Sequence, residues 1–167
     1  MKREIQGLIP KAIQATQLFL VKPGTNQVQK EYDGYSASLG AAVRNSGLLP
    51  ALTFYTDVNR NDGSAARRFK LLKAVAFCLG QTISTEDNKD DRKLLESVIK
   101  DVYGTNVFNR QLVKLNPEDR QPTILPDLPP KKEAAEKQWK DKIIFASIAL
   151  KLAMRNFEHT KEEQYES

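Results

Sequence analysis

Along most of the chain, apolar residues recur at spacings of three and four, which is the period of an amphipathic α-helix. Near the N-terminus this pattern takes in seven positions: Ile5, Leu8, Ile9, Ala12, Ile13, Phe19 and Leu20. No segment shows the sustained apolar–polar alternation that is typical of a half-buried strand. The sequence therefore predicts an all-α fold, a single-domain bundle of about six to seven helices.

Proline and glycine divide the first third of this pattern into separate helices. We expect Pro10 in the first turn of the first helix and Pro23-Gly24 at its end. A second helix is predicted over 27–45, with Gly47 just beyond it as a C-terminal cap. A third begins at Leu49-Pro50, again with proline in the first turn.

Similar signals predict three further helices in the middle of the chain. Ser64 suits the N-cap of a fourth helix that runs to about Leu79. Residues 84–87 are expected to open a fifth helix, with acidic residues in its first turn, and Gly104 to close it. A short sixth helix is predicted over 106–115, before a proline-rich linker.

That linker, residues 116–130, contains five prolines and reads as an extended surface segment. A long last helix is expected to follow from about Glu133 to His159. Because apolar residues lie on most of its sides, we predict that it is buried in the centre of the bundle. The residues on these sides are Trp139, Ile143, Ile144, Phe145, Ile148, Ala149, Leu150, Leu152, Met154 and Phe157.

The formal net charge of +5 is unevenly distributed along the chain. The first 80 residues carry 11 Lys and Arg against 5 Asp and Glu, an excess of +6. A basic excess of this kind suits a polyanionic partner on one face of the protein. The alternative is a soluble protein that is basic without such a partner, since net charge bears first on solubility.

No catalytic or metal-binding motif emerges. His159 is the only histidine and is expected to be solvated near a helix end. Cys78 lies among apolar residues, which is typical of an inert core thiol. The run 86–91 lacks the ligand spacing of a calcium loop and is interpreted as a solvated helix start. The sequence therefore predicts no enzyme, no metal and no cofactor.

The chain also lacks the marks of a secreted or membrane protein. A single cysteine indicates a reducing compartment. Polar residues interrupt the apolar N-terminal segment, so no signal peptide is predicted. The longest apolar stretch, 143–154, is too short to span a bilayer. A cytoplasmic location is expected.

Basic residues on the predicted fourth helix suggest a binding surface. Arg67, Lys70 and Lys73 step by three, which places them within an arc of roughly 120°. The other side of this helix is apolar and consists of Leu71, Leu72, Val75, Cys78 and Leu79. Cations spaced along a rigid helix can neutralise successive phosphates of a nucleic acid. An ordinary solvated helix face would show the same pattern. Arg68 is expected nearer the apolar side.

Two other places carry candidate RNA-binding cations. Lys151 and Arg155 lie at i and i+4 on the last helix, where they can also extend along its apolar edge. Arg44 lies just before the glycine turn at residue 47. With Arg67, Lys70 and Lys73, these residues make up the candidate set.

Two stretches resemble the small subunit of Cmr complexes, the type III-B CRISPR RNA-targeting assemblies. Residues 32–55 combine a Tyr-rich helix, the turn Asn45-Ser46-Gly47-Leu48-Leu49 and a short apolar helix. Residues 148–157 resemble the family's apolar C-terminal helix with its basic and aromatic end. One interpretation of residues 81–135, which match no part of this pattern, is a lineage-specific insertion.

The resemblance implies an all-α, non-catalytic, RNA-binding subunit that flanks the groove where guide RNA pairs with target RNA. The implied partners are the guide–target duplex, mainly the backbone of its target strand, the backbone and large subunits of the complex, and further copies of the same chain. No membrane and no cofactor are implied. The family's RNA contacts are scattered Lys and Arg residues, so the candidate set above comes from the physical pattern alone.

Two alternatives remain at this point. One is the corresponding helical subunit of the related type III-A (Csm) complex. The other is a helical protein–protein adaptor with no RNA role.

Overall fold

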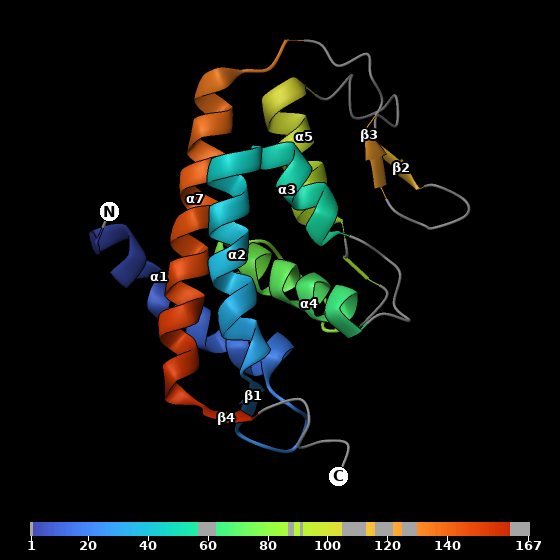
Figure 1. Ribbon diagram of the computed structural model, residues 1–167. Helices are drawn as coiled ribbons and strands as arrows, with labels where there is room; N and C mark the ends of the chain where they lie inside the picture. Colours follow the sequence, from blue (N-terminus) through green and yellow to red (C-terminus); the bar gives the residue numbers. More distant parts are fainter. Residues whose placement is uncertain are drawn as a thin grey trace.

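The computed structural model describes residues 2–56, 63–86, 89–90, 92–104, 113–115, 122–124 and 130–160. In these residues the fold is all-α, as predicted, with only three-residue strands beside the helices (Figure 1). The α-helices are α1 (Lys2–Ala15), α2 (Glu31–Ser46), α3 (Leu48–Tyr55), α4 (Gly63–Cys78), α5 (Lys93–Tyr103) and α7 (Glu133–Ala153).

Two short helical segments of other kinds extend α1 and α7. A π-helical turn, η1 (Thr16–Leu20), continues α1, and a 3-10 turn, η2 (Met154–Asn156), continues α7. The strands form two separate pairs. β1 (Gln27–Gln29) runs parallel to β4 (Glu158–Thr160), and β2 (Val113–Leu115) runs antiparallel to β3 (Pro122–Ile124).

Helix α7 lies at the centre of the bundle and packs against every other described α-helix (Figure 1). Its inner side is fully closed to solvent at Ile143 and Leu150, both 0% exposed. Trp139 donates a hydrogen bond from Nε1 to the Asp101 carboxylate at 2.8 Å, which ties α7 to α5. The predicted central, buried last helix is confirmed.

Helix α2 runs beside α7 in the opposite direction (Figure 1). Gly47 follows α2 with φ at +95°, a left-handed conformation that glycine adopts without a Cβ clash. This turn lets α3 start at once and pack against α2, α4 and α5. The predicted glycine cap is confirmed, and Gly104, with φ at +102°, ends α5 in the same way.

Several predicted boundaries are wrong. Pro10 lies inside α1, which begins at Lys2, and burial of Ile5, Ala12 and Ala15 offsets the hydrogen bond that proline removes. α2 begins at Glu31, because 27–29 pairs with 158–160, and this pairing also ends the last helix at Asn156. Three-residue strands contain no period that a sequence pattern can reveal.

The fifth helix was also predicted too early, since α5 begins at Lys93 and residues 84–86 form part of a loop. In the predicted sixth helix, 113–115 is a strand, and the rest of that prediction lies outside the described residues. The same is true of most of the predicted linker 116–130 and of the Ser64 side chain, although α4 already begins one residue before Ser64, at Gly63.

Candidate nucleic-acid interface

The three cations of α4 occupy three different environments. Lys70 is exposed and Arg67 is half-buried, whereas Lys73 is only 4% exposed. The expectation that all three face solvent is therefore wrong at Lys73. Segments on both sides of α4 cover that residue: η1, which packs against α4, and the loop that follows α4.

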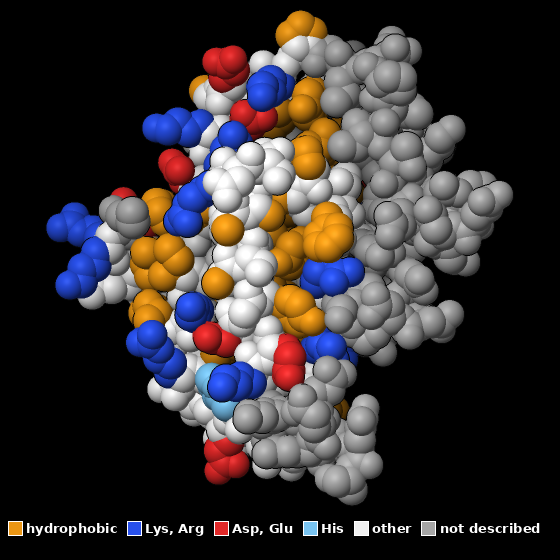
Figure 2. All heavy atoms as spheres, in the orientation of Figure 1, with side chains coloured by type: hydrophobic (Ala, Val, Ile, Leu, Met, Phe, Trp, Pro, Cys, Tyr) orange, Lys and Arg blue, Asp and Glu red, His pale blue; other side chains and the backbone are white. Residues whose placement is uncertain are grey.

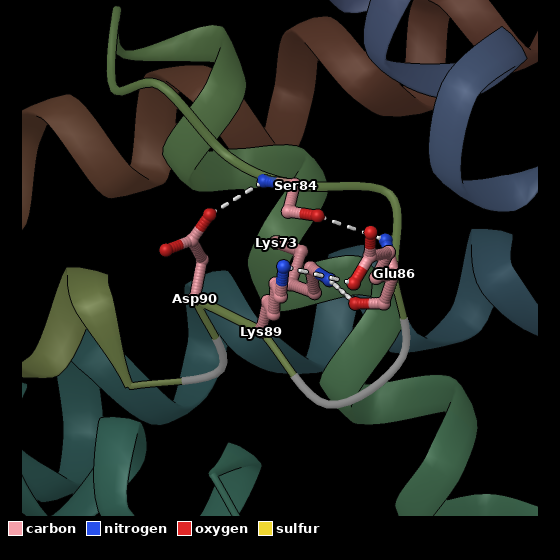
Figure 3. A network of polar contacts seen from close by, with 5 residues as sticks. All are labelled: Lys73, Ser84, Glu86, Lys89 and Asp90. Carbon is pink, nitrogen blue, oxygen red and sulfur yellow. Dashed lines mark hydrogen bonds and ion pairs between the residues drawn. The ribbon is translucent and has the colours of Figure 1, made fainter.

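Lys73 contacts both of these segments, and Figure 3 shows its contact with the loop. Its ammonium group donates a hydrogen bond to the Glu86 carbonyl oxygen at 2.8 Å. The same nitrogen lies 5.7 Å from the centroid of the Phe19 ring, which η1 provides. A buried ammonium group needs such partners, because transferring a bare charge out of water is costly. Through its hydrogen bond to Glu86, Lys73 holds the loop against α4.

The loop that carries Glu86 is held together by its own polar contacts (Figure 3). The Ser84 N–H donates to the Asp90 carboxylate at 2.6 Å, and the Ser84 hydroxyl accepts from the Glu86 N–H at 3.1 Å. Lys89 pairs with the Glu86 carboxylate at 3.2 Å, an exposed contact. The described residues of the acidic run, 86, 89 and 90, lie in a loop before α5 begins at Lys93, so the predicted helix start is wrong at these positions. Over the described residues, no cluster of His, Cys, Asp or Glu could hold a metal ion.

The two arginines of α4 lie over aromatic rings from neighbouring helices. The Arg67 guanidinium is 5.9 Å from the centroid of Tyr35 on α2. The Arg68 guanidinium is 4.5 Å from the centroid of Phe54 on α3, a ring that is 58% exposed. Cation–π contacts contribute about 0.5–1 kcal/mol at exposed sites and about 2 kcal/mol or more where the charge is desolvated. Arg68 is thus at the margin of the core, as its sequence position suggested.

The remaining candidates lie at opposite ends of the α2–α7 pair. Arg44 is exposed in the last turn of α2, next to Gly47. Lys151 is half-buried in the last turn of α7, and Arg155 is exposed in η2. Because α2 and α7 run antiparallel, Arg44 is far from the other two (Figure 1). The structure therefore does not bring the candidate set together into one site.

The distribution of charge on the surface agrees with this arrangement. Lys and Arg side chains on the face shown in Figure 2 are scattered, with hydrophobic side chains between them. One grouping was missed by the sequence pattern: Lys22, which follows η1, lines the same hollow as Lys70. The two lysines are 48 positions apart in the sequence, so no local spacing could have revealed it.

Cys78 and His159 are the single cysteine and the single histidine of the sequence, and each contacts a backbone carbonyl oxygen. Cys78 is buried on α4, and burial raises the pKa of its thiol to about 12. The predicted core position of Cys78 is confirmed, and its low reactivity stays a prediction. His159 is exposed in β4, with its Nε2 atom 2.8 Å from the Met154 carbonyl oxygen. His159 was expected near a helix end, and the helical turn that precedes it, η2, ends at Asn156.

Within the described part of the chain, no helix is both long and apolar enough to cross a membrane. Helix α7 carries Glu, Asp and Lys residues along its first half and Lys151 near its end.

Comparison with known proteins identifies the family. Residues 9–106 match the family model described as CRISPR-associated protein (Cas_Cmr5). The match contains α2, the glycine turn, α3, α4 and α5, and it extends through residues 81–106, whereas α7 lies outside it. That residues 81–135 are an insertion stays a prediction. No curated protein and no solved structure matches the chain.

The matched region is more than half of the chain, and it includes residues 32–55, one of the two stretches that resemble Cmr small subunits, whereas the other, 148–157, lies outside it. The chain therefore belongs to the Cas_Cmr5 family, the family of the small structural subunit of the type III-B CRISPR (Cmr) complex.

Proposed function

We propose that this chain is a non-catalytic, RNA-binding subunit of a Cmr effector complex, where it flanks the groove that holds the guide–target RNA duplex. The observation that carries the proposal is the family match over residues 9–106. The basic excess in the first 80 residues supports it, because most of that excess lies inside the matched region. In this role the chain contacts mainly the backbone of the target strand.

The exposed candidates Arg44, Lys70 and Arg155 are the best phosphate ligands of the set. Arg67 and Lys151 are half-buried and reach solvent in part. We remove Lys73 from the set, because its ammonium group is buried and bonded to the Glu86 carbonyl. Since the exposed cations lie on three different elements, they suit contacts with a long strand better than a compact binding site.

Contacts between these cations and phosphates do not distinguish one RNA sequence from another. Long basic side chains that bind phosphate fix the position of a nucleic acid, whereas base specificity requires contacts with base edges. The proposed subunit therefore stabilises any target strand that pairs with the guide. Neighbouring copies of the chain and the backbone subunits of the complex extend the same surface along the duplex.

Reconstitution of a Cmr complex with and without this chain tests the proposal. We expect the complex that lacks it to bind target RNA more weakly and to retain cleavage chemistry, because the proposed subunit supplies contacts and no catalytic group. The isolated chain should show no nuclease activity with or without divalent metal. Equal affinity of both complexes for target RNA would support the adaptor alternative, and cleavage by the isolated chain would overturn the non-catalytic assignment.

A further inference from the structure

A pocket of about 360 Å³ lies between η1 and α4, and Lys70 and Lys73 are among the residues that line it. Leu18 and Phe19 of η1 form part of its wall, and Phe69, Lys70 and Lys73 of α4 form another part. Pockets that bind small molecules measure about 300–1,000 Å³, so this one is large enough for a small organic ligand.

A second, smaller pocket of about 200 Å³ adjoins the first. The two share Phe19, Val21, Pro23 and Lys70, and the smaller one reaches Lys22 and Tyr32. The pair can therefore be treated as one hollow with two compartments, and Lys70 lies between them. We call it the η1–α4 hollow.

The walls of the η1–α4 hollow combine apolar rings with positive charge. Lys22 and Lys70 are exposed, whereas Lys73 is buried and held in place by the Glu86 carbonyl. Among the described residues that line either compartment, none is acidic. Leu18 is 49% exposed, so its side chain forms an accessible apolar part of the wall.

This combination fits a ligand with a flat apolar part and a negative part. An aromatic base gains from contact with apolar and aromatic side chains, and a phosphate gains from nearby ammonium groups. We propose that the η1–α4 hollow binds one ribonucleotide, with its base in the larger compartment beside Leu18 and Phe69 and its phosphate between Lys22 and Lys70. Lys73 adds positive potential from within the wall.

The nucleotide can come from two sources, a free mononucleotide or an unpaired nucleotide within an RNA strand. The site differs in kind from the scattered phosphate contacts proposed above, because it holds the base as well. The nucleotide site and the scattered phosphate contacts share only Lys70, so either can exist without the other.

Titration of the labelled full chain with the four ribonucleoside 5′-monophosphates, followed by nuclear magnetic resonance, tests the site. We expect saturable shifts confined to residues of the hollow, such as Leu18, Lys22 and Thr85. Inorganic phosphate and the free nucleosides should each bind more weakly than the nucleotide, since each carries only half of the proposed contacts. Equal affinity for inorganic phosphate would overturn the proposal in favour of a simple anion site.

Two variants and one control locate the binding. Lys70→Ala removes the shared cation and should weaken nucleotide binding by about tenfold or more. Ala66→Leu places a larger side chain in the larger compartment and should also weaken binding. Lys137→Ala makes the same change in charge at an exposed position of α7 and should leave the affinity unchanged. A loss of affinity in the control as large as that in Lys70→Ala would show that only net charge matters.

A short single-stranded RNA separates the two sources. If the strand supplies the nucleotide, the RNA should produce the same shifts and compete with the mononucleotide, and Ala66→Leu should weaken both. If only the mononucleotide produces these shifts, the source is a free nucleotide. Absence of shifts in the hollow with either ligand would overturn the site, and salt-dependent RNA binding elsewhere on the chain would still leave the proposed function in place.

Discussion

Helices α4 and α7 both carry cations beside apolar residues, yet the sequence predicted their environments with different success. On α7, the apolar positions became the centre of the bundle, as Ile143 and Leu150 show. On α4, the apolar side was equally well predicted, but Lys73 on the basic side is buried. The difference lies in what covers each helix. α7 is packed by other helices, whereas the basic side of α4 is covered by a π-helical turn and a loop.

The comparison shows what a helical period does and does not predict. It predicts which residues share a side, and the apolar side then becomes the side that meets the core. It does not predict whether a loop or turn from elsewhere in the chain packs over the polar side and buries a residue there. Lys70 and Lys73, one turn apart, end up exposed and buried for this reason.

The largest expected effect is at the centre of α7. Leu150→Ala should lower the free energy of unfolding by about 2–5 kcal/mol, because it leaves a cavity where no solvent can enter. Leu152→Ala, on the half-buried side of the same helix, is the matched control and should cost less. Urea unfolding of both variants measures the difference. Equal losses would contradict the central position of α7.

The next effect tests the buried cation of α4. Lys73→Ala removes a buried side chain and its hydrogen bond to the Glu86 carbonyl, so it should cost about 1–3 kcal/mol of stability. Lys70→Ala, one turn earlier and exposed, should change stability by less than about 0.5 kcal/mol. The same urea experiment compares them. If Lys73→Ala is as mild as Lys70→Ala, the loop does not depend on this lysine.

A pH-dependent effect tests how completely the apolar side of α4 is closed. Burial raises the pKa of Cys78 from 9.0 to about 12, so above pH 9 the folded state keeps a proton that the unfolded chain loses. Stability should therefore fall as pH rises from 9 toward 12, by at most about 1.4 kcal/mol per pH unit from this group.

The Cys78→Ala variant isolates this contribution. Burial also raises the pKa of Tyr55 to about 12, but that residue is present in both proteins and cancels in the comparison. The variant should lose stability less steeply than the parent over the same alkaline range. Parallel profiles would show that the thiol titrates as if it were exposed.

Much of the fold could be predicted from local chemistry. Gly47 and Gly104 mark helix ends because the left-handed backbone after each helix favours glycine. The extent of α4 followed from apolar spacing and is correct to within a residue or two. By contrast, the β1–β4 pair joins residues near 28 to residues near 159, and a contact over that separation has no local signal.

The candidate site was predicted less well, for the same reason. Exposure of Arg44 and Arg155 follows from their positions at helix ends. The grouping of Lys22 with Lys70 depends on how η1 packs against α4, a tertiary contact. Which cations face solvent could be judged only when the covering segments were known.

The central claim is that the exposed cations bind RNA through its phosphates, and the salt dependence of RNA affinity tests it most directly. Labelled single-stranded RNA is titrated with the isolated chain at several salt concentrations, and with the Arg44→Ala, Lys70→Ala, Arg155→Ala triple variant. We expect weak affinity that falls steeply with salt, and a slope that is shallower in the variant by about one unit for each phosphate that the protein no longer neutralises. An affinity that does not change with salt, or identical slopes for both proteins, would contradict the claim.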